Sequence, residues 1–178
     1  MDLRPIRLLY GYNHWANARI LDAAEKLTPE QLYAPNPGGF GSVRDTLVHL
    51  METEFFWGDL IWRGQANDID WEPYEFDPND YPSVPAIRAR WAGIASSLLA
   101  FIDELTPEGE NSPERIIVWQ SDAETQRRRP LWPQLPDLVI HATQHRSEIA
   151  MALTRHGSSP GEMDLSLYLR EHQPELFG

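Results

Sequence analysis

Cysteine is absent from the 178-residue sequence, and this absence removes several kinds of chemistry at once. Without a thiol, the chain cannot form a disulfide, use a cysteine nucleophile or hold a metal through cysteine sulfur. Any sulfur chemistry would therefore need a thiol that a substrate brings in. The remaining candidates for metal ligands are histidine and carboxylate side chains.

Long apolar runs are also missing. No segment approaches the roughly 20 apolar residues that a membrane-spanning helix needs. The first five residues, Met1 to Pro5, are not followed by an apolar stretch of the kind found in targeting segments. We therefore expect a cytoplasmic protein that has no membrane partner.

Basic side chains are scarce. Lys and Arg together number 15 against 27 Asp and Glu, which gives a net charge of −12. A nucleic-acid-binding protein needs a basic surface, so this balance argues against a nucleic-acid partner. The short basic run Arg127-Arg128-Arg129 is followed by Pro130 and is interpreted as a solvated turn.

The composition that remains is that of an ordinary globular domain, with 42% hydrophobic and 24% charged residues. The length predicts a single domain over residues 1–178. Apolar residues recur at helical spacing in four long segments, and this pattern predicts an all-α four-helix bundle. The expected helices cover about residues 5–26, 42–61 with Ser42 as N-cap, 83–105, and 132–156 with Gly157 as C-cap.

The connections between these helices are uneven. Residues 64–82 are rich in proline and acidic side chains, and such a long connection is usually functional or packs as a lid. Residues 115–119, opposite 125–127, predict a small β-hairpin before the last helix. Smaller elements complete the pattern: a capped helical turn at 28–31, a loop at 34–39 and a short helix at 163–169.

Three histidines form the most informative feature of the chain. His141 and His145 are four residues apart, so a helix projects both imidazoles from one face, where they can hold one metal ion. His49 lies two turns inside the expected second helix and could supply a third nitrogen. Three protein nitrogens leave a coordination position open, which is typical of catalytic rather than structural zinc sites. We expect zinc or nickel, with iron and manganese as alternatives, and the ligand types alone do not decide among these metals.

A histidine in such a sequence need not be a metal ligand. A histidine on an apolar face is often a core residue with one hydrogen-bond partner, and His14, His156 and His172 fit such non-ligand roles near helix ends or turns. Without a shared ligand, the buried imidazoles of His141 and His145 would each need a separate partner, because an unpaired buried polar group costs about 1–3 kcal/mol. One divalent cation satisfies both rings. A two-metal site is disfavoured, because the first and third helices offer no inward-facing glutamate.

Side chains next to the histidines suggest supporting roles. Glu148 follows His145 by three residues and is a candidate to accept a hydrogen bond behind the metal or to act as a general base. Glu52 stands at the same spacing from His49 and is expected to face solvent. Thr46 and Thr53 flank His49 on its helix face. Their hydroxyls are candidates for supporting the metal ligands from behind or for binding a water, and Thr53 is the second candidate catalytic residue.

The motifs around these residues resemble the DinB-like (damage-inducible, YfiT-like) family of bacterial four-helix-bundle metalloenzymes. The resemblance covers almost the whole chain. Four segments carry it: Tyr12-Asn13-His14-Trp15-Ala16-Asn17, then Gly41 to His49 with Glu54 and Trp57, then His141 to Arg146, and finally Met163 to Leu169. The chain departs from the family pattern at two places. Gln144 stands where a further histidine is common, and Ser147-Glu148 stands where Gly-Gln is common.

The resemblance implies that His49, His141 and His145 are the metal ligands. It also implies a divalent-metal-dependent enzyme that acts on a small molecule, as a thiol-dependent S-transferase using a low-molecular-weight thiol or as a hydrolase. A homodimer is expected on the same ground. The alternative is a non-catalytic metal-binding or stress-response interaction protein with the same fold, which exposed tryptophans would favour.

Overall fold

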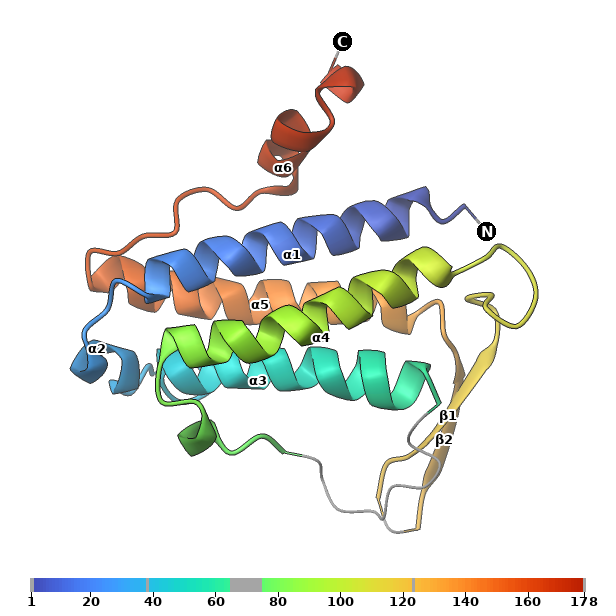
Figure 1. Cartoon of the computed structure of the whole chain (residues 1–178), viewed down its shortest axis with the longest axis horizontal. Helices are drawn as coiled ribbons and strands as arrows, with labels where there is room; N and C mark the ends of the chain where they lie inside the picture. Colours follow the sequence, from blue (N-terminus) through green and yellow to red (C-terminus); the bar gives the residue numbers. More distant parts are fainter. Residues whose placement is uncertain (1, 38, 65–74, 123, 178) are drawn as a thin grey trace.

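The computed structural model describes residues 2–37, 39–64, 75–122 and 124–177 (Figure 1). Four long helices lie side by side, and they confirm the predicted helical bundle. They are α1 (Arg4–Ala24), α3 (Val43–Phe55), α4 (Val84–Glu104) and α5 (Gln134–Arg155). Around the bundle α1 packs against α4, α4 against α3, α3 against α5, and α5 against α1. The seam between α3 and α5 therefore lies across the bundle from the seam between α1 and α4.

The helix ends follow from their local sequence. The Ser42 hydroxyl accepts a hydrogen bond from the Asp45 backbone N–H, and the Asp45 carboxylate accepts one from the Ser42 backbone N–H. This reciprocal pair satisfies two of the free N–H groups that begin α3. Ser83 caps α4 through the Ala86 N–H. Gly157 ends α5 with a φ of 75°, a backbone conformation that glycine adopts without steric penalty.

The predicted second helix differs from the structure in its last turns. A π-helical segment, η1 (Phe56–Trp62), continues α3 in place of regular α-helix. Contacts with α4 favour this wider turn: Ser97 Oγ donates a hydrogen bond to Asp59, and Gly58 lies so close to Leu98 that a Cβ there would be 2.9 Å from its Cδ1. Hydrophobic spacing alone does not reveal such tertiary contacts, and π-helical turns are frequent near functional sites.

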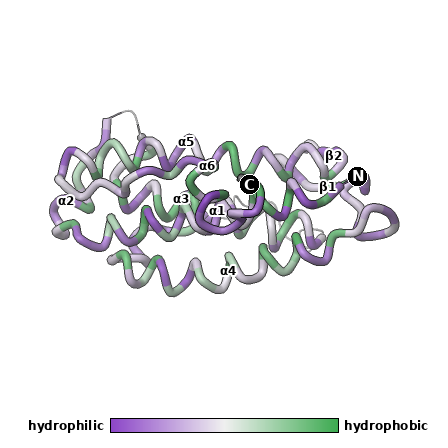
Figure 2. The backbone as a smooth tube through the Cα atoms, turned by 90° about the horizontal axis from the view of Figure 1, so that it is seen from above, coloured by the Kyte–Doolittle hydropathy of each residue, from purple (hydrophilic) through white to green (hydrophobic). Residues whose placement is uncertain are grey.

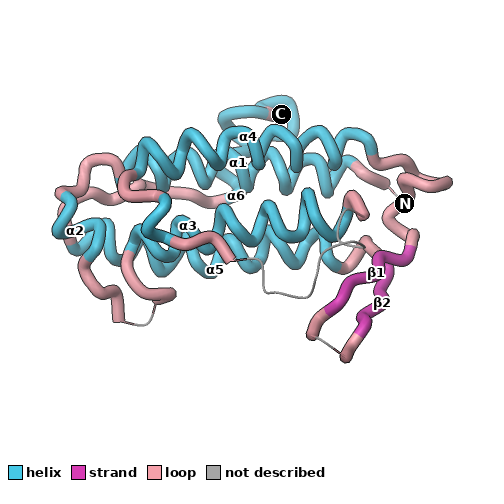
Figure 3. The backbone as a smooth tube through the Cα atoms, turned by 60° about the horizontal axis from the view of Figure 1, so that its bottom comes forward, coloured by secondary structure: helices cyan, strands magenta, loops and turns pink. Residues whose placement is uncertain are grey.

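The connections carry the smaller elements (Figure 3). The hairpin is confirmed as two antiparallel strands, β1 (Ile116–Gln120) and β2 (Gln126–Pro130), with Ile116 paired to Pro130. The Arg127-Arg128-Arg129 run is solvent-exposed as predicted, but it forms strand β2 and not a turn. The predicted connection 64–82 contains η3 (Pro78–Asp80), while its residues 65–74 lie outside the described part. The remaining elements are α2 (Pro29–Tyr33), α6 (Leu165–His172) and η4 (Pro174–Phe177).

Hydrophobic and hydrophilic residues alternate along every long helix (Figure 2), and the apolar positions meet in the bundle interior. One group of buried residues, including Leu47, Ile87 and Ile149, fills the end of the bundle near α2. A second group, including Tyr10, Trp62 and Leu135, fills the end near the hairpin. Within the described residues, no helix combines the length and apolar character that crossing a membrane requires.

Candidate metal centre

The structure brings His49 of α3 together with His141 and His145 of α5, at the seam between these two helices. Each histidine offers a ring nitrogen within 4.8 Å of those of the other two. The ring centroids lie 5.3 Å apart for His49 and His141, 4.9 Å for His49 and His145, and 4.6 Å for His141 and His145. The three predicted ligands thus converge on one point from two helices.

Two observations show that these nitrogens fit a metal. The Nε2 atom of His141 is buried and has no hydrogen-bond partner among the described residues, so a ligand would satisfy an otherwise orphaned group. The Nδ1 atom of His145 lies 2.8 Å from Oε2 of Glu148. A carboxylate can only accept, so Nδ1 carries the hydrogen and Nε2 is left with a lone pair for a cation.

The electrostatics of the cluster favour neutral imidazoles. Burial lowers the pKa of His49, and together with smaller contributions from the nearby His145 and His141 rings it takes this pKa from 6.5 to about 4. Burial also lowers the pKa of His141, again with a contribution from His145. Neutral imidazole is the form that binds metal ions, so these rings need not lose a proton near neutral pH.

Side chains around the cluster only partly match the predictions. Glu148 contacts His145, whereas Glu52 is half-buried, not solvent-facing, because its carboxylate accepts a hydrogen bond from the Phe76 backbone. The Thr53 hydroxyl donates to the His49 carbonyl at 2.8 Å, so only its oxygen lone pairs are available to a ligand. The Thr46 hydroxyl donates to the Ser42 and Phe40 carbonyls, and Thr46 is fully buried.

One neighbour of the cluster was missed by sequence reasoning. The ring of Phe40 stacks on the His49 imidazole, with centroids 4.1 Å apart and planes inclined by 19°. It also meets the His145 ring edge-on at 6.2 Å. Phe40 remains 53% exposed, so it forms a wall between the histidines and solvent. Its position in a loop before α3 gave no periodic signal that would have placed it there.

A buried polar network lies directly behind the centre and joins all four long helices. Arg146, the residue after His145, donates to the side-chain carbonyls of Asn13 and Asn17 on α1. Both asparagine amides donate in turn to Oε1 of Glu54 on α3, and Trp91 of α4 donates to its Oε2. The network fixes how α5 is rotated against α1, and hence which face of α5 carries the histidines toward α3.

Charge in this network is set mainly by burial. Burial raises the pKa of Glu54 above its ordinary value, against the effect of its three hydrogen-bond donors. Burial lowers the pKa of the Arg146 guanidinium. The sequence signal for this network was visible: Asn13 and Asn17 share one face of α1, and Glu54 is the polar member of an apolar stripe on α3.

The fold and the histidine cluster together define a helical-bundle protein with a possible three-histidine metal site. The chain belongs to the DinB family, whose sequence model matches residues 3–176. It is also similar to Protein DinB of Bacillus subtilis (strain 168), with 22% identity over 162 residues. That similarity covers 90% of this chain and 91% of the relative.

Proposed function

We propose that the protein is a divalent-metal-dependent enzyme that acts on a small molecule, as a thiol-dependent S-transferase or a hydrolase. The observation that carries the proposal is the convergence of the His49, His141 and His145 nitrogens, with the buried Nε2 of His141 left without a partner. Three neutral nitrogen donors and no sulfur donor suit zinc or nickel, and iron and manganese are the alternatives.

The chain's own residues have separable roles in this proposal. His49, His141 and His145 would hold the divalent cation, which would lower the pKa of a thiol or water and so supply a nucleophile near neutral pH. Glu148 holds the His145 ring through one carboxylate oxygen, and its second oxygen is available to accept a proton. The Thr53 oxygen accepts a hydrogen bond from an incoming water, since its own hydrogen is committed to the His49 carbonyl.

The side chains that flank the histidines limit how a substrate can reach the site. Phe40 lies over His49 and excludes water from one side of that ring. The low-molecular-weight thiol in the proposal has to come from outside, because the chain contains no cysteine. The alternative of an interaction protein draws little support from the tryptophans, since Trp132, at 46%, is the one exposed tryptophan among those described.

Metal analysis of the purified protein tests the proposal. We expect the wild type to bind about one equivalent of zinc or nickel, and His145→Ala to bind less than about a tenth of an equivalent. His156→Ala is the matched control, because His156 is exposed at the end of the same helix. If the wild type binds no divalent metal, the proposal fails. If metal-loaded protein turns over no combination of thiol and electrophile and no hydrolysable ester, the catalytic part fails.

A further inference from the structure

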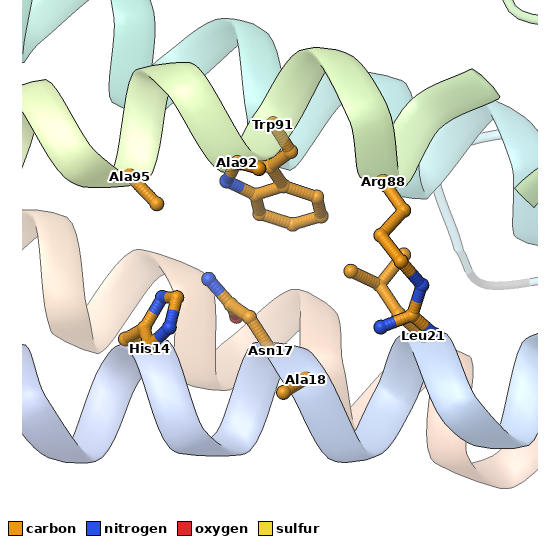
Figure 4. A pocket seen from close by; sticks show the side chains of 8 residues that line it. All are labelled: His14, Asn17, Ala18, Leu21, Arg88, Trp91, Ala92 and Ala95. Carbon is orange, nitrogen blue, oxygen red and sulfur yellow. The ribbon is translucent and has the colours of Figure 1, made fainter. Parts of the chain in front are cut away.

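The seam between α1 and α4 holds a groove that is separate from the metal centre (Figure 4). His14 and Ala18 of α1 face Trp91, Ala92 and Ala95 of α4 across it. The histidine cluster occupies the opposite seam of the bundle, between α3 and α5. None of the residues that line the groove belongs to that cluster, so a ligand here would be distinct from a substrate at the metal.

Small side chains leave the space open. Ala18, Ala92 and Ala95 stand where larger residues would fill the seam, and the resulting cavity has a volume of about 220 Å³. A cavity of roughly 150 Å³ is enough to hold a benzene molecule. The groove therefore has room for one six-membered ring with a short substituent.

The floor of the groove is electron-rich. Trp91 donates its indole N–H to Oε2 of Glu54 at 2.6 Å, and Glu54 is only 3% exposed. Asn17, which also lines the groove, donates to the other oxygen of the same carboxylate at 2.9 Å. A hydrogen-bond acceptor behind the indole N–H increases electron density in the ring, and an electron-rich indole face attracts cations.

The far end of the groove also carries excess negative charge. Arg88 lines this end, and its Nη2 atom is paired with Asp22 at 2.8 Å and Glu25 at 3.0 Å. One guanidinium between two carboxylates leaves a net charge of −1 at this rim. A bound anion would be repelled there, so the groove selects against acids.

The near end gives access to the buried acid. His14 and Ala95 also line a second, smaller cavity of about 10 Å³, whose other walls include Asn13 and Glu54. That volume is close to the space one water molecule needs. A polar group placed beside His14 therefore lies next to a small chamber whose walls include Glu54.

We propose that the α1–α4 groove binds a small organic ammonium ion, with its charged group over the indole face of Trp91 and its apolar ring against the alanines. The apolar walls favour binding of the ring. The electron-rich indole and the acidic surroundings favour binding of the positive charge. The site is independent of the metal and does not rest on the proposed enzymatic function.

Titration calorimetry on the full chain, supported by amide chemical-shift mapping, tests this site with three probes of one shape. Cyclohexylammonium is the cationic probe, and cyclohexanol and cyclohexanecarboxylate are its neutral and anionic counterparts. We expect the cation to bind at least about tenfold more tightly than either counterpart, with shifts centred on α1 and α4. Equal binding of cyclohexanol, or no binding of the cation at millimolar concentrations, would overturn the proposal.

Matched variants locate the site. Ala92→Leu fills the groove and is expected to weaken cation binding at least about tenfold, whereas Ala100→Leu, also exposed on α4, leaves it within about twofold. Ala18→Leu fills the groove from the α1 side and serves if Ala92→Leu does not fold.

His145→Ala should bind the cation normally. Loss of binding in this variant would place the probe at the histidine cluster and overturn the proposal. Sedimentation provides a further check. If the wild type is a dimer that Ala92→Leu converts to a monomer, a second copy of the chain fills the groove and the proposal is overturned.

Discussion

The Nδ1 atom of His145 lies 2.8 Å from Oε2 of Glu148, which follows it by one turn on α5. The carboxylate fixes the orientation of the imidazole and the position of its hydrogen, so that Nε2 faces outward as a donor. Carboxylates in this position raise the basicity of a metal-binding imidazole. Glu148 stands where the resemblance led us to expect an amide, and a charged acceptor strengthens this effect.

Removing that carboxylate should weaken metal binding while the three ligands remain. We expect Glu148→Ala to lower zinc affinity about 10- to 100-fold in competition with a chelator of known affinity. Glu148→Gln keeps an acceptor without the charge and should fall between the alanine variant and the wild type. The matched control is Glu52→Ala, which has the same spacing from His49 but accepts from the Phe76 backbone. Equal zinc affinity in Glu148→Ala and the wild type would show that Glu148 does not support the centre.

Metal addition should stabilise the fold through the same three histidines. A ligand that binds only the native state adds about 2.7 kcal/mol to the free energy of unfolding at 100 times its Kd. We expect the Tm of the metal-free wild type to rise on addition of zinc and the Tm of His141→Ala to stay nearly constant. His156→Ala, altered at an exposed histidine, should respond like the wild type. An equal rise in His141→Ala would mean that zinc binds elsewhere.

The helices and their ends could be predicted because their signals are local. Ser42 caps α3 as expected, and Gly157 ends α5 as its sequence indicated. The π-helical turn η1 could not be predicted, because the contacts of Asp59 and Gly58 with α4 depend on how two distant segments pack. Arg127 to Arg129 were misassigned to a turn, since strand β2 forms only through pairing with β1.

The candidate site likewise contains contacts that the sequence predicts and contacts that depend on how distant segments pack. His141 and His145 share a helix face by spacing alone, so their proximity needs no tertiary information. The proximity of His49 to His141 and His145 was expected, but it depends on the packing of α3 against α5. Phe40 lies in a loop without periodicity, and the Phe76 backbone that holds Glu52 is distant in sequence. Contacts of this kind depend on chain paths that composition and spacing do not encode.

Two glycines in helical segments should respond oppositely to the same substitution. Gly93 on α4 is exposed, and an added Cβ would meet nothing within 4 Å, so Gly93→Ala should stabilise the protein by about 0.5–1 kcal/mol. At Gly58 a Cβ would lie 2.9 Å from Cδ1 of Leu98, which is itself buried. We expect Gly58→Ala to be less stable than Gly93→Ala by at least about 1 kcal/mol in urea unfolding. Equal stability would show that Leu98 moves aside freely and that η1 does not depend on close packing with α4.

The buried Glu54 predicts a pH dependence of stability with a definite sign. Burial raises its pKa in the folded protein above the ordinary value of 4.5, so the folded state binds this proton more tightly than the unfolded chain does. The stability that this proton contributes is present below the unfolded pKa and is lost as the pH rises through the folded pKa. Glu54→Gln has no such proton and should carry only a constant penalty for its altered hydrogen bonds. The free energy of unfolding of Glu54→Gln minus that of the wild type should therefore increase as the pH rises above the ordinary value of 4.5.

Glu30 provides the control of opposite sign. Hydrogen bonds from its own backbone N–H and from the Thr28 hydroxyl lower the pKa of this exposed carboxyl. Its contribution is present above the unfolded pKa and is lost as the pH falls through the folded pKa, so the corresponding difference for Glu30→Gln should decrease as the pH rises toward 4.5 and stay level above it. Urea unfolding of metal-free protein across the pH range gives both differences, and effects common to the whole chain cancel in each. A flat or falling difference for Glu54→Gln would mean that Asn13, Asn17 and Trp91 hold Glu54 as a carboxylate against the effect of burial.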